Sequence, residues 1–368
     1  MDALSKIALT FTPGLGNTTI RRLVDLCKGE DVFSLPPSEL RLLFANHGAV
    51  YDNVVGKVGF ARAEQELRFC EQHGIQPLFF TDADYPRRLN RGETQDCPAL
   101  LYRLGGADLN VQRSVAMVGT RRATPQGRTT ADRLVEQMKP LGCTVVSGLA
   151  YGIDTAAHAA ALAHGLPTVA VLGHGLDRIY PTPNTALAKQ IIAMGGALLT
   201  EYPSGTAINP RYFPARNRII AALADATVVV EASERGGALI TAAIAAGYHR
   251  EVFAVPGRIT DTYSSGTNNL IATQRALLLR HADDLAYQLG WPLPSGSAAG
   301  TQQHLLPTLD AAEQPLFDLL DRQGRMSIDE LAEASGMPMP RVAGLLFGLE
   351  MKKVVRVLPG HLYERVEG

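Results

Sequence analysis

The sequence is poor in the residues that proteins use to hold metals. Its 368 residues include four cysteines, Cys27, Cys70, Cys97 and Cys143, and no two of them form a CxxC motif. The nine histidines show neither HxxxH nor HExxH spacing. These absences exclude a zinc site that could be recognised from the sequence. Isolated cysteines also suit a reducing compartment, so we expect a cytoplasmic protein.

Long apolar runs and a net charge of one sign are also missing. No run reaches the length that spans a membrane, and the first residues, MDALSKIALT, do not resemble a signal peptide, so we expect no membrane partner. The formal net charge is −1, so any attraction to nucleic acid has to come from a local patch. With 46% hydrophobic residues, the chain can build a sizeable core divided over two or three domains.

The middle of the chain alternates between strand-like and helix-like segments. Five apolar runs between Val115 and Glu231 each end in a polar turn, and a further run ends at Arg258. Uniformly apolar stretches such as VAVL and VVV are typical of strands that helices cover on both faces. We therefore predict a parallel sheet, with an additional strand at 98–105, whose ligands bind beyond the carboxyl ends of the strands. The predicted helices of this region are 124–141, 153–164, 185–194, 215–223, 238–248 and 268–275.

Arginine recurs in the turns that follow these strands. The arginines in question are Arg121, Arg122, Arg178, Arg211, Arg216, Arg218, Arg235 and Arg258. The loops at the carboxyl ends of parallel strands meet at one edge of the sheet. The pattern therefore predicts one shared surface for anions, and that surface is too wide for a single small phosphate.

The first 75 residues show helical spacing of apolar residues, at 3–9, 18–27 and 61–72. Within them, TPGLGNTTIRRL places a Pro-Gly-Leu-Gly turn between two helices. The unit resembles a helix-hairpin-helix motif, whose glycine amides can hold a DNA phosphate, with Arg21 and Arg22 following one to two turns later. A compact helical cap with a tight turn explains the same residues equally well.

The end of the chain reads as a linker followed by a small domain. Pro, Gly and Ser dominate the linker, and three helices at 311–322, 328–334 and 340–351 then precede a hairpin that turns at Pro359-Gly360. This arrangement resembles a winged helix. From Leu306 to Gly368 the chain has seven Lys and Arg and ten Asp and Glu, a balance of −3. Since phosphate affinity comes from neutralising cations, we expect this domain to contact protein rather than DNA.

Eight motifs, in this order along the chain, resemble the DprA (Smf) family of DNA-processing proteins. The motifs are VGTRRATPQG, SGLAYGIDTAAH, YPTPN, EYPSGT, FPARNRIIAALAD, VVVEA, GGALITAAIAAGYHREVFAVPG and GTNNLIATQRA. The resemblance is strong over residues 110–285. It implies an α/β fold with an extended Rossmann-like sheet, an N-terminal helical (helix-hairpin-helix or SAM-like) domain and a C-terminal winged-helix-like domain. We thus predict a helical domain at 1–75, the Rossmann-like domain at 76–290, a linker at 291–305 and the winged-helix-like domain at 306–368.

The resemblance also implies a function and a set of contacts. Family members bind single-stranded DNA, dimerise and load the RecA recombinase during natural transformation, with no established catalytic chemistry and no cofactor. Carried over to this chain, the DNA contacts are Arg121, Ser147, Gly148, Arg178, Phe213, Arg216, Asn217 and Arg218. Arg121 would meet a phosphate, while Ser147 and Gly148 would offer a hydroxyl and an amide. Phe213 would stack on a base.

Structural roles compete with these expectations. Arg216 and Arg218 would lie at the start of a helix, where the dipole favours phosphate. Because they are two residues apart they cannot share a helix face, and one of them could instead pair with Glu201 or Glu231. Phe213 could equally fill the core at the sheet edge. Asp154 is expected in an N-cap or first helical turn rather than as a catalytic acid.

Two departures from the family pattern concern the predicted site. Tyr151 stands where many relatives have arginine in SGLARGID, which removes a charge and adds a ring. Gly236-Gly237-Ala238 replaces SGS, which removes two hydroxyls. The DNA footprint is therefore expected to differ in detail.

Other functions fit the sequence less well. VGTRRATPQG is not the GxGxxG of dinucleotide-binding enzymes. Nucleotide phosphoribohydrolases on a similar sheet are the main alternative and carry PGGxGTxxE at the turn that reads RGGALITAA here. Arg235 replaces the proline and Ala243 replaces the glutamate, so the identifiable general acid or base is missing. A scaffold whose arginines form only ion pairs is the third reading.

Overall fold

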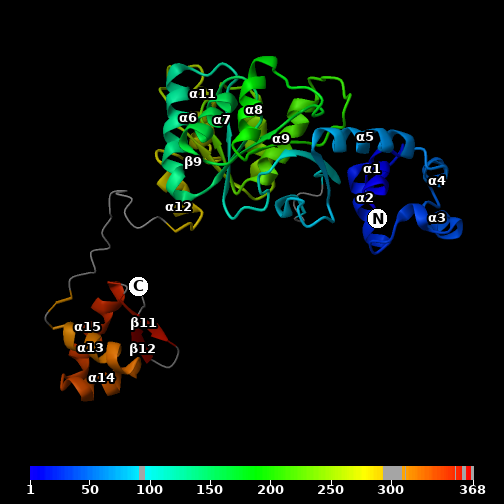
Figure 1. Ribbon diagram of the computed structural model, residues 1–368. Helices are drawn as coiled ribbons and strands as arrows, with labels where there is room; N and C mark the ends of the chain where they lie inside the picture. The colour runs from blue at the N-terminus through cyan, green and yellow to red at the C-terminus, as the bar shows by residue number, and fades with distance from the viewer. Residues whose placement is uncertain (91–95, 293–308, 311, 353, 359–361, 366–368) are drawn as a thin grey trace. The chain divides into compact units, whose positions relative to one another are not determined.

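The computed structural model describes residues 1–90, 96–292, 309–310, 312–352, 354–358 and 362–365. The chain forms two compact units, residues 1–295 and 296–368 (Figure 1). Each unit has its own hydrophobic core. Most of the predicted linker lies outside the described residues. Among the described helices, none has the length and apolar character required to cross a bilayer.

A nine-stranded sheet forms the centre of the first unit. Its strands are β1 (Ile75–Phe79), β2 (Leu100–Gly105), β3 (Ser114–Val118), β4 (Thr144–Ser147), β5 (Thr168–Val171), β6 (Ala197–Thr200), β7 (Ala226–Val229), β8 (Glu251–Ala254) and β9 (Leu277–Leu278). They lie in the order β1-β2-β6-β5-β4-β3-β7-β8-β9, and all neighbours from β6 to β9 are parallel. The predicted Rossmann-like parallel sheet is thus confirmed. The strand predicted at 98–105 is β2, which pairs with β1 and β6 to form an antiparallel edge. The strand order reverses between β3 and β7, and crevices for ligands form at such reversals.

Helices cover both faces of this sheet. The helices are α6 (Pro125–Met138), α7 (Ile153–His164), α8 (Thr185–Ala193), α9 (Tyr212–Leu223), α10 (Gly237–Gly247), α11 (Ser265–Ala272) and α12 (Ala282–Gln288). Successive strand residues point to opposite faces. Val115 and Met117 of β3 accordingly pack into one core with α6, α7 and α12, whereas Ala116 and Val118 belong to the core that contains α9 and α10. The double coverage explains why strands β3 to β7 are buried along their length and mostly apolar.

The start of α9 corrects one expectation. The helix begins at Tyr212 rather than at 215, with Pro214 in its first turn. Proline is tolerated there because the first-turn N–H groups have no partner within the helix. Arg216 and Arg218 therefore lie in the second turn, beyond the range in which the helix dipole acts on charge.

Five helices precede the sheet: α1 (Ala3–Phe11), α2 (Asn17–Leu26), α3 (Pro37–Leu43), α4 (Gly48–Val55) and α5 (Phe60–His73). The turn between α1 and α2 uses Gly14 at φ +87°, where a Cβ would lie 2.7 Å from a methyl of Val50. Arg21 of α2 donates hydrogen bonds to Asn90 Oδ1 at 2.7 Å and to the Pro98 carbonyl at 2.8 Å. Arg21 thus fastens α2 to the segment that leads into β2. A DNA contact of the hairpin stays a prediction.

The second unit has the element order of a winged helix. Its described elements are α13 (Gln314–Gln323), β10 (Arg325–Ser327), α14 (Ile328–Ser335), α15 (Met339–Met351), β11 (Val355–Leu358) and β12 (Leu362–Arg365). The strands form an antiparallel sheet in the order β10-β12-β11, and the predicted turn at Pro359-Gly360 lies outside the described residues. Glu364 of β12 pairs with Arg325 at 2.5 Å and with Arg356, so one carboxylate ties the three strands together.

Candidate nucleic-acid interface

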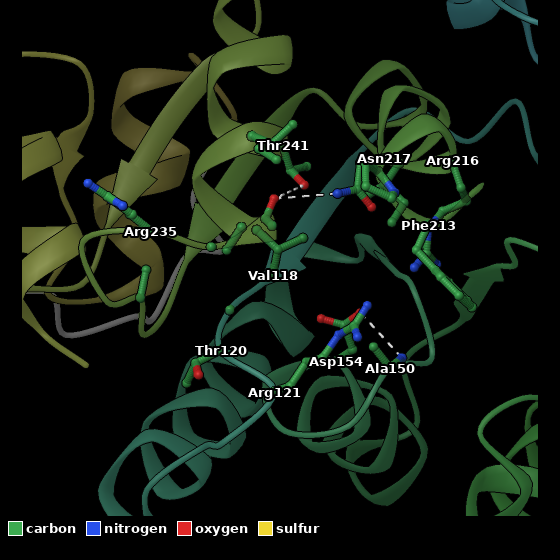
Figure 2. A pocket seen from close by; sticks show the side chains of 18 of the residues that line it. Val118, Thr120, Arg121, Ala150, Asp154, Phe213, Arg216, Asn217, Arg235 and Thr241 are labelled. Carbon is green, nitrogen blue, oxygen red and sulfur yellow. Dashed lines mark hydrogen bonds between the residues drawn. The ribbon is translucent and has the colours of Figure 1, made fainter. Parts of the chain in front are cut away.

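A cavity of about 450 Å³ opens where the strand order reverses, at the carboxyl ends of β3 and β7. Its walls come from the loops after β3, β4, β5, β6 and β7 and from α7, α9 and α10 (Figure 2). The charged and aromatic residues that line it are Arg121, Asp154, Tyr180, Phe213, Arg216 and Arg235. Among the described lining residues, three arginines therefore face a single carboxylate.

Arg121 and Phe213 meet on one side of this cavity. The Arg121 guanidinium lies 5.6 Å from the centre of the Phe213 ring, a cation–π distance. Tyr180 also packs against Phe213 in a tilted arrangement, with 5.5 Å between ring centres, and is 41% exposed. Phe213 is half-buried at the cavity wall, so part of its ring stays open to a ligand.

Arg216 forms part of the cavity wall and is only 3% exposed. Its Nη1 donates to the carbonyl oxygens of Gly148, at 2.6 Å, and Val171, while no described group accepts from its buried Nε. Burial lowers the pKa of Arg216 to about 10, although Asp154 acts in the opposite sense. A Cβ at position 148 would lie 2.3 Å from Nη1, so only glycine leaves room for the guanidinium.

Asp154 is the buried carboxylate of the cavity. It lies in the first turn of α7, as expected, and its Oδ2 accepts hydrogen bonds from the Gly148 and Ala150 amides at 3.2 and 3.4 Å. Burial raises the pKa of Asp154, and the positive charge of Arg216 opposes this effect. The carboxylate therefore holds the β4–α7 loop against the arginine rather than standing free in the cavity.

Ser147 and Gly148 lie beneath the cavity surface. The Ser147 side chain is fully buried, and its hydroxyl donates to the Met117 carbonyl at 2.6 Å. The Gly148 amide is bonded to Asp154. Both groups are thus engaged within the sheet edge in this conformation, and a direct contact with DNA stays a prediction.

The remaining predicted residues divide between cavity and surface. Asn217 lines the cavity and donates to the Gly237 carbonyl at 3.4 Å. Arg218 points away from it and forms a two-pronged ion pair with Glu201, at 2.5 and 2.7 Å. The expected ion pair with Glu201 therefore falls to Arg218, on the helix face opposite to Arg216. Arg178 is half-exposed and pairs with the neighbouring Asp177.

Tyr180, Arg235 and Thr241 are among the cavity residues that were missing from the predicted site. Tyr180 belongs to the YPTPN motif, Arg235 lies in the turn that leads into α10, and Thr241 lies within α10. The signal for Arg235 was its position after a buried strand, as for Arg121. No sequence signal shows that Tyr180 meets Phe213, because the two lie on different loops.

The N-terminus of α6 is closed to phosphate by the protein itself. In a dinucleotide-binding Rossmann fold this helix end holds the pyrophosphate. Here the Glu231 carboxylate accepts from the Thr124 amide at 3.0 Å and from its hydroxyl at 2.5 Å. A Cβ at position 127 would lie 2.2 Å from that carboxylate. The internal anion thus fills the place that a dinucleotide would need.

Comparison with known proteins extends over both units. The family model of DNA recombination-mediator protein A matches residues 76–290, and that of the DprA winged helix domain matches residues 301–361. DprA relatives from Mycobacterium tuberculosis are 42% identical over 259 residues, and the matched region spans 69% of this chain and 65% of theirs.

Two solved structures of DNA processing protein A resemble the fold. The protein from Streptococcus pneumoniae has a TM-score of 0.68 at 33% identity, covering 78% of this chain and 98% of that one. The protein from Helicobacter pylori, whose structure is described by its single-stranded DNA binding mode, has a TM-score of 0.53 at 29% identity. That similarity covers 60% of this chain and 97% of the other.

Proposed function

This chain belongs to the DNA recombination-mediator protein A (DprA/Smf) family, and on that basis we propose that it is a recombination mediator that binds single-stranded DNA. In this proposal it protects incoming DNA during natural transformation and loads RecA on the strand. It acts as a homodimer in the cytoplasm, so that two modest DNA sites act together with raised avidity.

The single observation that carries the proposal is the composition of the cavity at the β3–β7 reversal. Arg121, Arg216 and Arg235 supply positive charge, and the rings of Phe213 and Tyr180 supply stacking surfaces. Cationic grooves with aromatic rings are the usual means of binding a single strand without sequence preference. The H. pylori relative, which is 29% identical, has a known single-stranded DNA binding mode, and this supports the same ligand here.

Within this site the residues take different parts. Arg121, Asn217 and Arg235 reach the strand from the cavity wall, and Phe213 stacks on a base. Arg178 exchanges its ion pair with Asp177 for a phosphate. Arg216 contributes its charge from beneath, supported by Gly148 and Asp154.

Fluorescence anisotropy with a labelled poly-dT oligonucleotide across a salt series tests the proposal. We expect binding whose affinity falls steeply with salt, because each phosphate that the protein neutralises releases counterions. A scaffold whose arginines form only ion pairs would show no binding, and binding that ignores salt would contradict the arginine site.

We further propose that the protein acts without breaking bonds in its ligand. Asp154 is the one carboxylate among the described lining residues, and it is bonded to two backbone amides. Incubation with nucleoside monophosphates should release no base. Addition of the protein should speed RecA filament formation on strands that a single-strand-binding protein already covers. Base release that disappears on Arg235→Ala would support the phosphoribohydrolase alternative instead.

A further inference from the structure

The N-terminus of α10 opens into the cavity without a cap. The residue before the helix is Gly236, which has no side chain to accept from the first amides. Gly236, Gly237 and Ala238 all line the cavity. Within the described part of the chain, the amides of Gly237 and Ala238 have no hydrogen-bond acceptor. Free N–H groups at a helix N-terminus attract anions.

Arg216 adds to this cavity a positive charge that the described groups satisfy only in part. It is a buried guanidinium in the cavity wall with one nitrogen, Nε, that no described group satisfies. A buried donor without an acceptor is rare in folded proteins. Arg121 and Arg235 add two further positive charges, and Asp154 offsets only one (Figure 2). The cavity thus holds more positive charge than the protein itself neutralises.

The aromatic part of the cavity wall suits a base. Phe213 and Tyr180 line the same cavity as the α10 amides, and stacking on rings accepts any nucleobase. A volume of about 450 Å³ falls in the range of small-molecule sites, about 300–1,000 Å³. One cavity therefore combines an anion site with a stacking wall, which is the pattern of a nucleotide.

The charge of the phosphate decides which nucleotide binds best. A phosphomonoester carries about −1.5 to −2 at neutral pH, whereas each linkage within a strand carries about −1. An uncapped helix end among three arginines favours the more negative group. We propose that the N-terminus of α10 is a subsite for the terminal phosphate of a nucleotide, held either as a free nucleoside 5′-monophosphate or as the phosphorylated end of a strand.

Strand-end binding rests on the proposed DNA function, whereas binding of the free nucleotide does not. Titration calorimetry with dTMP, thymidine and inorganic phosphate tests binding of the free nucleotide directly. Fluorescence anisotropy with 5′-phosphorylated and 5′-hydroxyl poly-dT tests binding of the strand end. We expect dTMP to bind at least tenfold more tightly than either thymidine or inorganic phosphate, and the phosphorylated oligonucleotide to bind more tightly than the hydroxyl form.

Two substitutions of Gly237 test the contribution of its backbone N–H to phosphate binding. Gly237→Pro removes the N–H at the first helical residue, where proline is well tolerated, and the extended backbone of Gly236 suits a following proline. Gly237→Ala adds a side chain but keeps the N–H, and its Cβ would lie 3.9 Å from the nearest atom, Asn217 Nδ2. Gly237→Pro should lose most of the preference for phosphate, and Gly237→Ala should keep it.

The outcomes separate this inference from the proposed function. Equal binding of dTMP and thymidine, together with equal binding of the two oligonucleotides, would overturn the inference while leaving salt-dependent DNA binding intact. A preference that survives Gly237→Pro would also overturn it. Inorganic phosphate binding as tightly as dTMP would overturn the nucleotide assignment. Selective dTMP binding by a protein that binds no oligonucleotide would support the inference and contradict the DNA function.

Discussion

At the scale of single residues, Arg121 and Arg122 allow a direct comparison between an arginine that lines the cavity and one that does not. They are adjacent and equally charged, but only Arg121 lines the cavity and contacts Phe213. Arg121→Ala should weaken binding of poly-dT about tenfold and flatten the plot of log affinity against log salt by about one, since one phosphate contact is lost. Arg122→Ala should change both far less. Equal losses in the two variants would place the strand outside the cavity.

His158 gives the first unit a defined sensitivity to acid. Its Nδ1 meets the Thr168 hydroxyl at 2.7 Å, no described group satisfies its Nε2, and burial together with Arg216 lowers its pKa to about 3. The unfolded chain takes up a proton near pH 6.5, whereas the folded chain resists it. The contribution of His158 to stability is thus complete above pH 6.5 and is lost as the pH falls towards 3, by on the order of 2 kcal/mol at pH 5.

Urea unfolding at pH 7.5 and pH 5 measures this effect. His158→Gln cannot take up a proton, so its free energy of unfolding should fall less between the two pH values than that of the parent protein. His164→Gln, on the same helix but with its ring bonded to Asp132 at the surface, serves as the control. Parallel pH dependences for His158→Gln and the parent would show that another group carries the sensitivity.

The sequence predicted which residues lie near the site better than it predicted the contacts that each side chain makes there. The spacing of Arg216 and Arg218 correctly put them on opposite faces of α9. It could not tell which face met the cavity, because that depends on Glu201 from a different strand end. The burial of Ser147 was likewise invisible, since a serine at a strand end reads the same whether its hydroxyl faces solvent or the carbonyl of Met117.

At the scale of elements, α5 holds the loop that leads from β6 into α9. Glu66 of α5 is 1% exposed, and its two oxygens accept from the Ser204 amide at 2.8 Å and from the Ser204 hydroxyl at 2.6 Å. Arg62 pairs with Glu66 and donates to the Ser204 carbonyl. A helix from the start of the chain thus fixes the loop that positions Phe213.

Removal of that carboxylate should loosen the loop. Glu66→Ala leaves the Ser204 amide and Arg62 without their acceptor, so we expect a loss of about 1–3 kcal/mol in the free energy of unfolding. Hydrogen exchange of the amides around Ser204 should become faster. Glu64→Ala removes an exposed carboxylate from the same helix and should change neither quantity. Unchanged exchange in Glu66→Ala would mean that other contacts hold the loop.

Element boundaries were predicted well where capping residues are clear and less well elsewhere. Ile153–His164 was predicted to the residue, because glycines flank the segment on both sides. The start of α9 was missed because Pro214 suggested a boundary, although proline fits in a first turn. β1 was missed because IQPLF contains a proline, which its position at the edge of the sheet accommodates.

At the scale of the whole molecule, charge is unevenly distributed between the two units. The chain as a whole is at −1, whereas residues 306–368 carry a balance of −3, so the first 305 residues are positive by comparison. Within the first unit, three arginines line the cavity at the carboxyl edge of the sheet. Electrostatic attraction to DNA is therefore expected from the first unit, and the winged helix is left for contacts with protein.

A truncation tests whether the first unit alone carries the DNA contacts. A chain that ends near Pro292 keeps the whole sheet and its flanking helices, which form a compact unit with their own core. It should retain most of its affinity for poly-dT, and the salt dependence should match that of the full chain because the same phosphates are neutralised. Circular dichroism and thermal unfolding control for folding of the shortened chain. A loss of a hundredfold or more, about 2.7 kcal/mol, would place essential DNA contacts in the second unit despite its negative balance. A loss confined to RecA loading, with DNA affinity intact, would instead give the winged helix the protein-contacting part that its charge predicts.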